Sequence, residues 1–115
     1  MTENSTVIKI ETLSELKEIL EDDFELLVSS YLEDAHSRME RLEAAIAAAD
    51  AAVIKAEAHS LKGSSLNLGA QSLPELCSVL EKCGNDEALQ DTPELFSKIQ
   101  GEFAKVQSIL KNHVA

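Results

Sequence analysis

The sequence predicts an all-α protein: an antiparallel four-helix bundle with a short additional helix at the N-terminal end. Apolar residues recur at steps of three and four along most of the 115 residues, as they do on the buried side of amphipathic helices. Two prolines and four glycines leave few breaks, which favours long helices over many short strands. Only 3% of the residues are aromatic, so we expect an aliphatic core. One compact domain over residues 1–115 suits this length.

Residues 1–11 form a leader with one apolar patch, at residues 7–10, which is either a docked extended segment or a frayed end. The sequence Thr-Leu-Ser-Glu at residues 12–15 has the pattern of a capping box, which predicts that a short first helix opens there. The side chains expected on the buried side of this helix are Leu13, Leu16, Ile19 and Leu20.

The second helix is expected to begin at Asp22 or Asp23 and to continue for about six turns. Leu32 and Met39 lie beside its buried stripe. They are either further core residues or apolar contacts for a docking partner. The stripe itself is expected to contain Phe24, Leu27, Val28, Tyr31, Ala35, Leu42 and Ile46.

The alanine-rich stretch at residues 43–58 contains no strong helix breaker, so the helical pattern extends over residues 23–68. One helix of that length would be about 70 Å long, whereas a globule of this size is about 30 Å across. The chain must therefore turn back. Asp50 is the best N-cap residue in the stretch, which predicts a turn at residues 49 and 50.

The third helix is expected to cover residues 51–68, with Gly69 as its C-terminal signal. A second capping-box pattern, at residues 72–75, predicts the start of the fourth helix, which is expected to end near Gly84 and Asn85. The buried side chains of the fourth helix are expected to be Leu73, Leu76, Cys77 and Leu80.

The last helix is predicted to open at Thr92 and Pro93, because proline is well tolerated in the first turn. Short links between the long helices make neighbouring helices antiparallel. The buried stripe of the last helix is expected to contain Leu95, Ile99, Phe103, Val106 and Leu110.

The spacing of the Cys, His and Glu residues does not match a disulfide or a metal site. Cys77 and Cys83 are six positions apart and point in different directions on one helix, which excludes a local disulfide and a C-x-x-C motif. Glu33 and His36 have the E-x-x-H spacing of di-iron bundles, but the sequence contains no second copy. We therefore expect no metal site.

The formal net charge of −11 argues against binding to nucleic acids and to anionic membranes, because both are negatively charged. No apolar run approaches the roughly 20 residues that span a bilayer. The first residues lack the basic start and the apolar stretch of a signal peptide. We therefore expect a cytoplasmic protein without nucleic-acid or membrane partners.

A functional face is predicted on the third helix, around His59. The buried stripe of this helix is centred on Ile54, and His59 lies about 140° away on a helical wheel, so its ring points to solvent or to a partner. Lys55 and Lys62 flank His59 at i−4 and i+3. The other buried positions of the helix are expected to be Ala58, Leu61, Ser65 and Leu68.

This face is suited to phosphoryl transfer. A neutral imidazole is a good nucleophile near neutral pH, and the two lysines offset the negative charge of an incoming phosphoryl group. Gly63 lies away from the core and removes a side chain that would block the ring, while Leu66 is a candidate contact for a partner. The alternative is an ordinary solvated helix face. The sequence contains no glycine-rich loop of the kind that binds ATP.

Residues 59–65, His-Ser-Leu-Lys-Gly-Ser-Ser, followed by Leu-Gly-Ala at residues 68–70, resemble the motif of the histidine-containing phosphotransfer (HPt) domain family, H-x-L-K-G-S-[SA]-x-x-[LI]-G-A. The match is specific, because many positions agree at fixed spacing. Residues 13–20 resemble the short first helix of the family, and residues 73–81 resemble the run after its active helix. Asp50 stands where the family turns before that helix.

The resemblance implies that His59 accepts a phosphoryl group on Nε2 from a phospho-aspartyl receiver domain and passes it to another receiver. Lys62 would assist electrostatically, and Gly63 would provide access to the ring. Lys55 is added from the helical wheel and is not part of the family motif. The receiver would supply Mg²⁺, so this chain would have no cofactor of its own and would be a phosphoryl carrier, not a complete enzyme.

The implied partners are the receiver domains of response regulators and a hybrid sensor kinase, and a monomer is sufficient for such transfer. Candidate docking residues are Leu66, Leu32 and Met39. The alternative function is a helical adaptor that docks a receiver or a kinase without accepting phosphate. An adaptor would not need His59, Lys62 and Gly63 together, which favours phosphotransfer.

Overall fold

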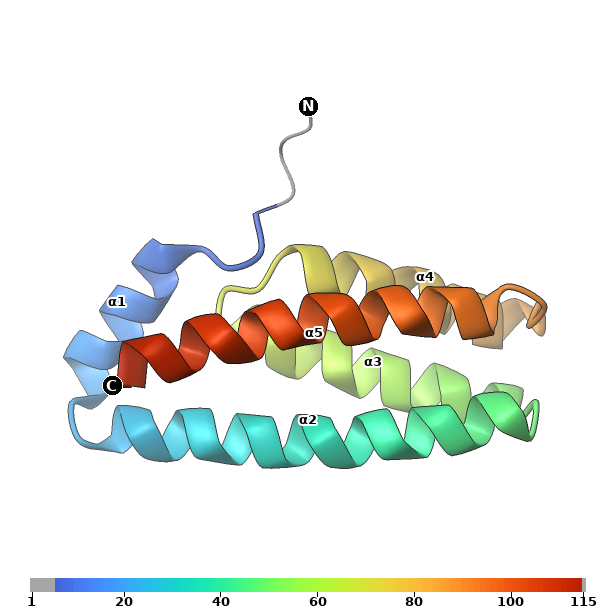
Figure 1. Cartoon of the computed structure of the whole chain (residues 1–115), viewed down its shortest axis with the longest axis horizontal. Coiled ribbons are helices and arrows are strands. Elements are labelled where there is room, and N and C mark those ends of the chain that lie inside the picture. The colour runs from blue at the N-terminus through green and yellow to red at the C-terminus, as the bar shows by residue number, and fades with distance from the viewer. Residues whose placement is uncertain (1–5, 115) are drawn as a thin grey trace.

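A computed structural model describes residues 6–114, and these residues form five α-helices. The four long helices run side by side, and the short first helix lies at the end of the bundle where the second begins (Figure 1). The predicted all-α bundle with a short helix before it is therefore confirmed. The helices are α1 (Ile10–Leu20), α2 (Asp23–Ala47), α3 (Ala51–Asn67), α4 (Ser72–Asp86) and α5 (Thr92–Val114).

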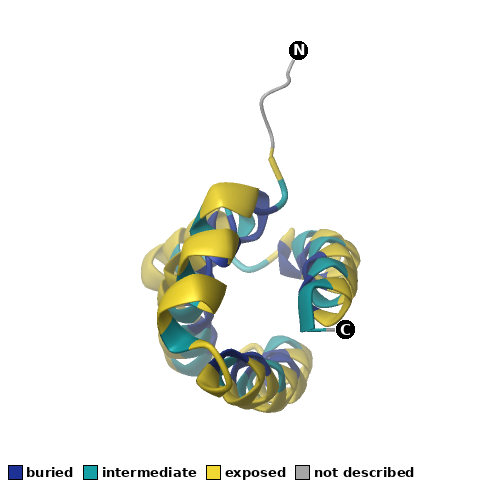
Figure 2. Ribbon diagram, turned by 90° about the vertical axis from the view of Figure 1, so that its left-hand side faces the viewer, coloured by how far each residue is buried: buried dark blue, intermediate teal, exposed yellow. Residues whose placement is uncertain are grey.

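The core of the bundle is mainly aliphatic, as the low aromatic content predicted. In a view along the bundle, the buried residues lie on the sides of the helices that face a common interior, and the exposed residues lie on the outer sides (Figure 2). Burial of one leucine side chain stabilises the fold by about 1.5–3 kcal/mol. The buried aliphatic side chains together therefore make the main favourable contribution to the folding free energy. The largest completely buried side chains include Leu13, Leu42, Ile54, Leu61, Leu73, Leu80, Ile99 and Leu110.

The alanine-rich stretch turns back where the sequence predicted. α2 ends at Ala47, and the Asp50 carboxylate caps α3 by accepting a hydrogen bond from the backbone N–H of Val53 at 3.2 Å. This bond satisfies one of the free N–H groups at the helix start. The longest dimension of the Cα trace is 42 Å, which agrees with a chain that folds back on itself.

The N-terminal apolar patch is docked on the bundle and is not frayed. Ile8 is 3% exposed and forms an isolated antiparallel β-bridge with Ala70, in the link between α3 and α4. The backbone N–H of Lys9 donates to the carbonyl oxygen of Gly69 at 2.9 Å. Residues 1–5 of the predicted leader lie outside the described residues.

Both predicted capping boxes are wrong. α1 begins at Ile10, before the predicted box, and its N-cap residue Lys9 makes no side-chain cap. α4 begins at Ser72, whose backbone N–H donates to the carbonyl oxygen of Thr6 in the docked segment. The Ser72 hydroxyl donates instead to Glu102 of α5 at 2.5 Å. Backbone pairing with the docked segment thus takes the place of a side-chain cap at α4, because it satisfies the same kind of amide group.

Predicted burial is correct for most positions, with one clear exception in α1. Leu13 is completely buried, but Ile19 is 74% exposed, because α1 contacts the bundle only at its end. On α2, Met39 is 9% exposed and belongs to the core, and Leu32 is partly buried against it. The core interpretation of these two residues is therefore correct, and Met39 has little surface accessible to a docking partner.

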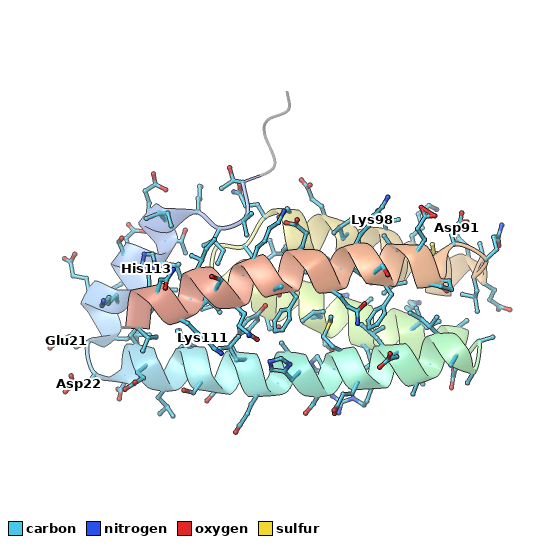
Figure 3. The ribbon with its side chains drawn as sticks, in the orientation of Figure 1. Glu21, Asp22, Asp91, Lys98, Lys111 and His113 are labelled. Atoms are coloured by element: carbon cyan, nitrogen blue, oxygen red, sulfur yellow. The ribbon has the colours of Figure 1, made fainter. Side chains whose placement is uncertain are left out.

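The C-terminal end of α5 lies beside α1 and the link to α2, where Figure 3 labels His113, Glu21 and Asp22. Nζ of Lys17 on α1 donates a hydrogen bond to the carbonyl oxygen of His113 at 2.6 Å. The positive side chain of Lys111 in the same last turn interacts favourably with the negative end of the helix dipole. The hydrogen bond from Lys17 to His113 joins α1 to the last helix of the bundle.

Both cysteines are free thiols, as their spacing predicted. Burial raises the pKa of the Cys77 thiol to about 12, so this thiol stays protonated and unreactive in the folded protein. Within residues 6–114, no three His, Cys, Asp or Glu side chains lie together in a way that could hold a metal ion. In the same part of the chain, none of the helices is long and apolar enough to cross a membrane.

Candidate functional site

The predicted functional face lies on α3, which packs most extensively against α4 and also contacts α2. Ile54, Ala58 and Leu61 are completely buried on its inner side. The His59 side chain points away from the core and is 67% exposed. The orientation expected from the helical wheel is therefore confirmed.

A carboxylate from the neighbouring helix contacts the His59 ring. Nδ1 of His59 lies 3.0 Å from Oε2 of Glu81 on α4. The other oxygen of this carboxylate, Oε1, accepts a hydrogen bond from Nζ of Lys62 at 2.7 Å. The Glu81 side chain is 21% exposed, so one partly buried carboxylate joins the two residues of the α3 motif that the sequence predicts to act in phosphoryl transfer.

Glu81 is ionised at physiological pH. The hydrogen bond from Lys62 is the main reason that the pKa of the Glu81 carboxyl lies below its ordinary value, and the hydrogen bond from His59 adds to this effect against the opposing effect of burial. An ionised carboxylate only accepts hydrogen bonds, so its contact with His59 requires the proton on Nδ1. In the neutral ring the lone pair then lies on Nε2.

Sequence reasoning missed Glu81 as a site residue, because His59 and Glu81 are 22 positions apart on different helices. The signal that would have found it is the symmetry of the α3–α4 hairpin. The pair His59–Glu81 and the pair Lys55–Asn85 both have Ala70, in the link, as the midpoint of their sequence positions. An antiparallel helical hairpin brings residues at equal distance from its turn to the same level.

The remaining predicted residues lie on the outer surface of α3. Gly63 is exposed, and a Cβ added there would meet no heavy atom within 4 Å, so packing does not require a glycine. Leu66 is 53% exposed. Lys55 is also exposed, but its Nζ donates to Oδ1 of Asn85 on α4 at 2.9 Å, which draws the ammonium group towards α4.

Two hollows border the C-terminal half of α3. One lies between α3 and α4, and the other, which is mainly apolar, lies between α3 and the first two helices. Leu66 belongs to the first, so the exposed leucine is continuous with a concave surface. The first hollow is lined by Lys62, Leu66, Gln71, Pro74, Glu75 and Ser78, and the second by Leu16, Leu20, Leu27, Ser30, Tyr31, Ser64, Asn67 and Leu68.

Comparison with known proteins identifies the family of this chain. The family model of the Hpt domain matches residues 26–109. This chain belongs to the Hpt domain family. The crystal structure of histidine-containing phosphotransfer protein B (HptB) from Pseudomonas aeruginosa PAO1 is similar to this Hpt protein with a TM-score of 0.89 and 33% sequence identity, over 95% of each chain. A search of curated protein sequences found no match.

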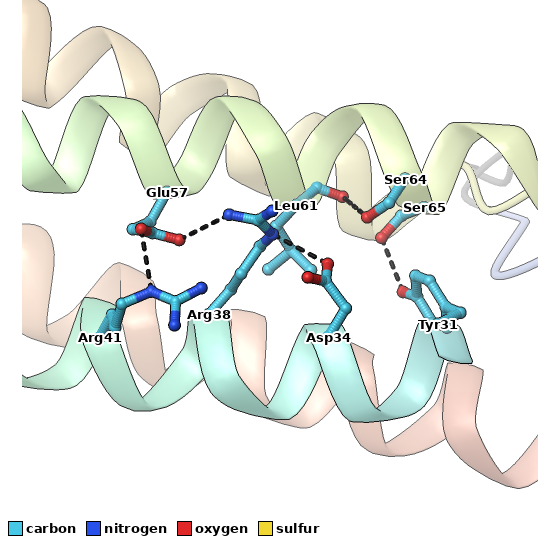
Figure 4. A network of polar contacts seen from close by, with 8 residues as sticks. All are labelled: Tyr31, Asp34, Arg38, Arg41, Glu57, Leu61, Ser64 and Ser65. Atoms are coloured by element: carbon cyan, nitrogen blue, oxygen red, sulfur yellow. Dashed lines mark hydrogen bonds and ion pairs between the residues drawn. The ribbon is translucent and has the colours of Figure 1, made fainter. Parts of the chain in front are cut away.

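In this Hpt protein, α3 is joined to α2 by a partly buried network of ion pairs (Figure 4). Arg38 donates from Nε to Asp34 and from Nη1 to Glu57, both at 2.9 Å. Arg41 donates from Nε to the other oxygen of Glu57 at 3.0 Å. Glu57 lies two residues before His59, so the network holds α3 at the turn that presents the imidazole.

A second contact between α2 and α3 is buried. The hydroxyl groups of Tyr31 and Ser65 are 2.7 Å apart (Figure 4). Burial raises the pKa of the Tyr31 hydroxyl to about 12, so this group stays protonated. The contact satisfies the polar atoms of both side chains inside the core, where an unpaired hydroxyl would destabilise the fold.

Proposed function

We propose that this Hpt protein carries a phosphoryl group on His59 within a two-component phosphorelay. His59 accepts the group from the aspartyl phosphate of one receiver domain and passes it to the aspartate of another. The observation that supports this most directly is an exposed imidazole whose Nδ1 atom lies 3.0 Å from the Glu81 carboxylate. This contact leaves Nε2 free to act as the nucleophile.

In the proposed transfer, the Nε2 lone pair of His59 attacks the phosphorus atom. A P–N bond forms while the P–O bond to the aspartyl carboxylate breaks, and the aspartate leaves with the electron pair. The ring keeps its proton on Nδ1 and gains positive charge as the bond forms. Glu81 accepts the hydrogen bond from that proton and stabilises the developing charge. The reverse steps deliver the group to the next receiver.

Two further residues of α3 assist this chemistry. The Lys62 ammonium donates at 2.7 Å to the same Glu81 carboxylate that contacts the His59 ring, and its positive charge offsets the negative charge of the phosphoryl oxygens. The open space at Gly63 allows the receiver aspartate to approach. Lys55 contributes a weaker positive potential, because its ammonium group is held by Asn85. The receiver supplies Mg²⁺, and this chain acts as a carrier without a cofactor of its own.

The proposed partners are response-regulator receiver domains and a hybrid sensor kinase, which meet the protein in the cytoplasm. The receiver docks over Leu66 and the adjoining hollows, because an exposed leucine beside a concave surface offers apolar area to a partner. Leu32 is at most a minor contact, since it is partly buried. Transfer needs one protein and one receiver, so a monomer suffices.

The test is transfer of label from a receiver domain phosphorylated with radioactive phosphate. The wild-type protein is expected to gain label that is lost in acid and retained in base, as phosphohistidine behaves. A His59→Gln variant is expected to gain none. His36→Gln is the matched control. His36 is also an exposed imidazole, but it lies on α2 and its ring is hydrogen-bonded to the Gln107 side chain.

Label that still arrives on the His59→Gln variant would contradict the assignment of the phosphorylated residue. A wild-type protein that binds a receiver in a pull-down or by calorimetry, yet stays unlabelled with every receiver of its organism, would instead establish the adaptor function. The two results are distinguishable in one set of experiments, because binding and labelling are measured separately.

A further inference from the structure

We propose that Gly84 is a positioning residue for phosphotransfer: it lets α4 lie against the backbone of α3, which brings Glu81 within reach of His59 and Lys62. This inference rests on the proposed function of His59. It assigns to Gly84 a role different from the helix-ending role that the sequence suggested, since α4 continues to Asp86.

The space around Gly84 admits no side chain. A Cβ added there would lie 2.8 Å from the carbonyl oxygen of Ala51, 2.9 Å from the backbone nitrogen of Lys55 and 3.1 Å from its Cα. All three atoms belong to the backbone of α3, which helical hydrogen bonds hold in place. None of them belongs to a flexible side chain that could move aside. Gly84 is buried, so the two helices touch here through their backbones.

This contact lies one helical turn from the catalytic contacts on both helices. On α4, Glu81 precedes Gly84 by three residues, and on α3, Lys55 precedes His59 by four. The hydrogen bond between Lys55 and Asn85, at 2.9 Å, lies at the same crossing. The distance between the helix axes at Gly84 therefore sets how far the Glu81 carboxylate must reach.

An added methyl group would have to move from 2.8 Å to an ordinary contact of at least 3.4 Å from the α3 backbone. The required separation is several tenths of an ångström, which is enough to weaken hydrogen bonds that now measure 3.0 Å to His59 and 2.7 Å to Lys62. A weaker bond from Nδ1 to Glu81 would reduce the preference of the ring for the form with Nδ1 protonated.

The other helical glycines provide a matched comparison. A Cβ at Gly63 or Gly101 would meet no heavy atom within 4 Å, so only Gly84 combines a helical position with a steric requirement. Gly101 lies on α5, away from His59, and Gly101→Ala is expected to stabilise the protein. A Gly101→Ala background therefore offsets the stability that Gly84→Ala removes. It also serves as the control, because it makes the same glycine-to-alanine change where an added Cβ meets no heavy atom within 4 Å.

The experiment compares Gly101→Ala with the double variant Gly84→Ala/Gly101→Ala. The first readout is the ring ¹⁵N chemical shifts of His59, which distinguish protonated Nδ1 from protonated Nε2 and do not depend on phosphotransfer. The second is the rate of label transfer from a phosphorylated receiver. We expect the double variant to lose the dominance of the Nδ1-protonated form and to transfer about tenfold more slowly, as expected for a misplaced catalytic group.

Adding Glu81→Ala supplies the decisive combination. If Gly84 acts through Glu81, Glu81→Ala should slow transfer by about the same factor as Gly84→Ala. The two substitutions together should then slow transfer no more than either one alone. The proposal would be overturned if the two substitutions slowed transfer by the product of their separate factors. It would also be overturned if Gly84→Ala/Gly101→Ala kept the ring shifts and the transfer rate of the wild type. A double variant that does not fold would also overturn it, because the role would then be global. Failure of the proposed function would appear differently, as absence of label on the wild-type protein.

Discussion

Gly63 follows His59 by four residues and leaves the outer face of α3 open. A glycine in the middle of a helix costs about 1 kcal/mol relative to alanine. No atom within 4 Å of an added Cβ requires a glycine at this position. We attribute its presence to access for the receiver, so that this residue exchanges some stability of the folded protein for function.

Substitutions at Gly63 should therefore separate stability from transfer. Gly63→Ala is expected to raise the free energy of unfolding by up to about 1 kcal/mol, measured by urea denaturation. Gly63→Leu is expected to keep the fold and to slow transfer from a phosphorylated receiver by about tenfold or more, because its side chain obstructs the approach to the ring. Gly101→Leu, at the other exposed helical glycine, is the control. Equal transfer rates for the two leucine variants would contradict a role for Gly63 in access.

At the scale of helices, α3 is joined to each of its two neighbours, α2 and α4, through one carboxylate that accepts from two basic side chains. Glu57 of α3 receives Arg38 and Arg41 from α2, and Glu81 of α4 receives His59 and Lys62 from α3. These polar contacts act in addition to the buried apolar stripe, which resists rotation of the helix. The orientation of the imidazole is therefore a property of three helices together.

The Glu57 network leads to a prediction about stability. Glu57→Gln is expected to lower the free energy of unfolding by about 1 kcal/mol, because a partly buried charged acceptor for two arginines is lost. Asp86→Asn is the control: it breaks the exposed pair with Lys82 on α4, which should contribute little. Equal effects of the two substitutions in urea denaturation would show that the network adds nothing beyond an exposed ion pair.

At the scale of the whole molecule, the charge of −11 makes the response to acid informative. The hydrogen bond from Lys62 holds the pKa of Glu81 below its ordinary value. For Glu102, burial would raise the pKa, but the hydrogen bonds from Ser72 and Lys105 outweigh it and the pKa is lowered. Both carboxylates therefore stabilise the folded protein in their ionised form.

The sign of the effect follows from these directions. A carboxyl whose pKa is lower in the folded state contributes stability above its unfolded pKa, here 4.5, and loses it as the pH falls through the folded value. The free energy of unfolding of the wild-type protein should thus decline below about pH 4.5. A Glu81→Gln/Glu102→Gln variant should be less stable than wild type near neutral pH, and the difference should vanish in acid. Parallel curves for the two proteins would contradict this account.

Local patterns in the sequence were sufficient for much of the fold. Apolar residues at helical spacing predicted the long helices and their buried sides, and Asp50 marked the turn between α2 and α3. The same periodicity placed His59 away from the core, which the structure confirms. These predictions succeed because the side of a helix that becomes buried is determined by residues within a few turns.

Contacts between distant parts of the chain, in contrast, arise only when the helices pack. The docked segment near Ile8 replaces the predicted cap of α4, and Ile19 is exposed because α1 contacts only the end of the bundle. Glu81 reaches His59, and Gly84 allows it to do so, because α3 and α4 pack backbone to backbone at one crossing. The helices and the outward orientation of the His59 ring thus follow from local sequence patterns. The partner of that imidazole depends on helix spacing and register, which arise only when the helices pack.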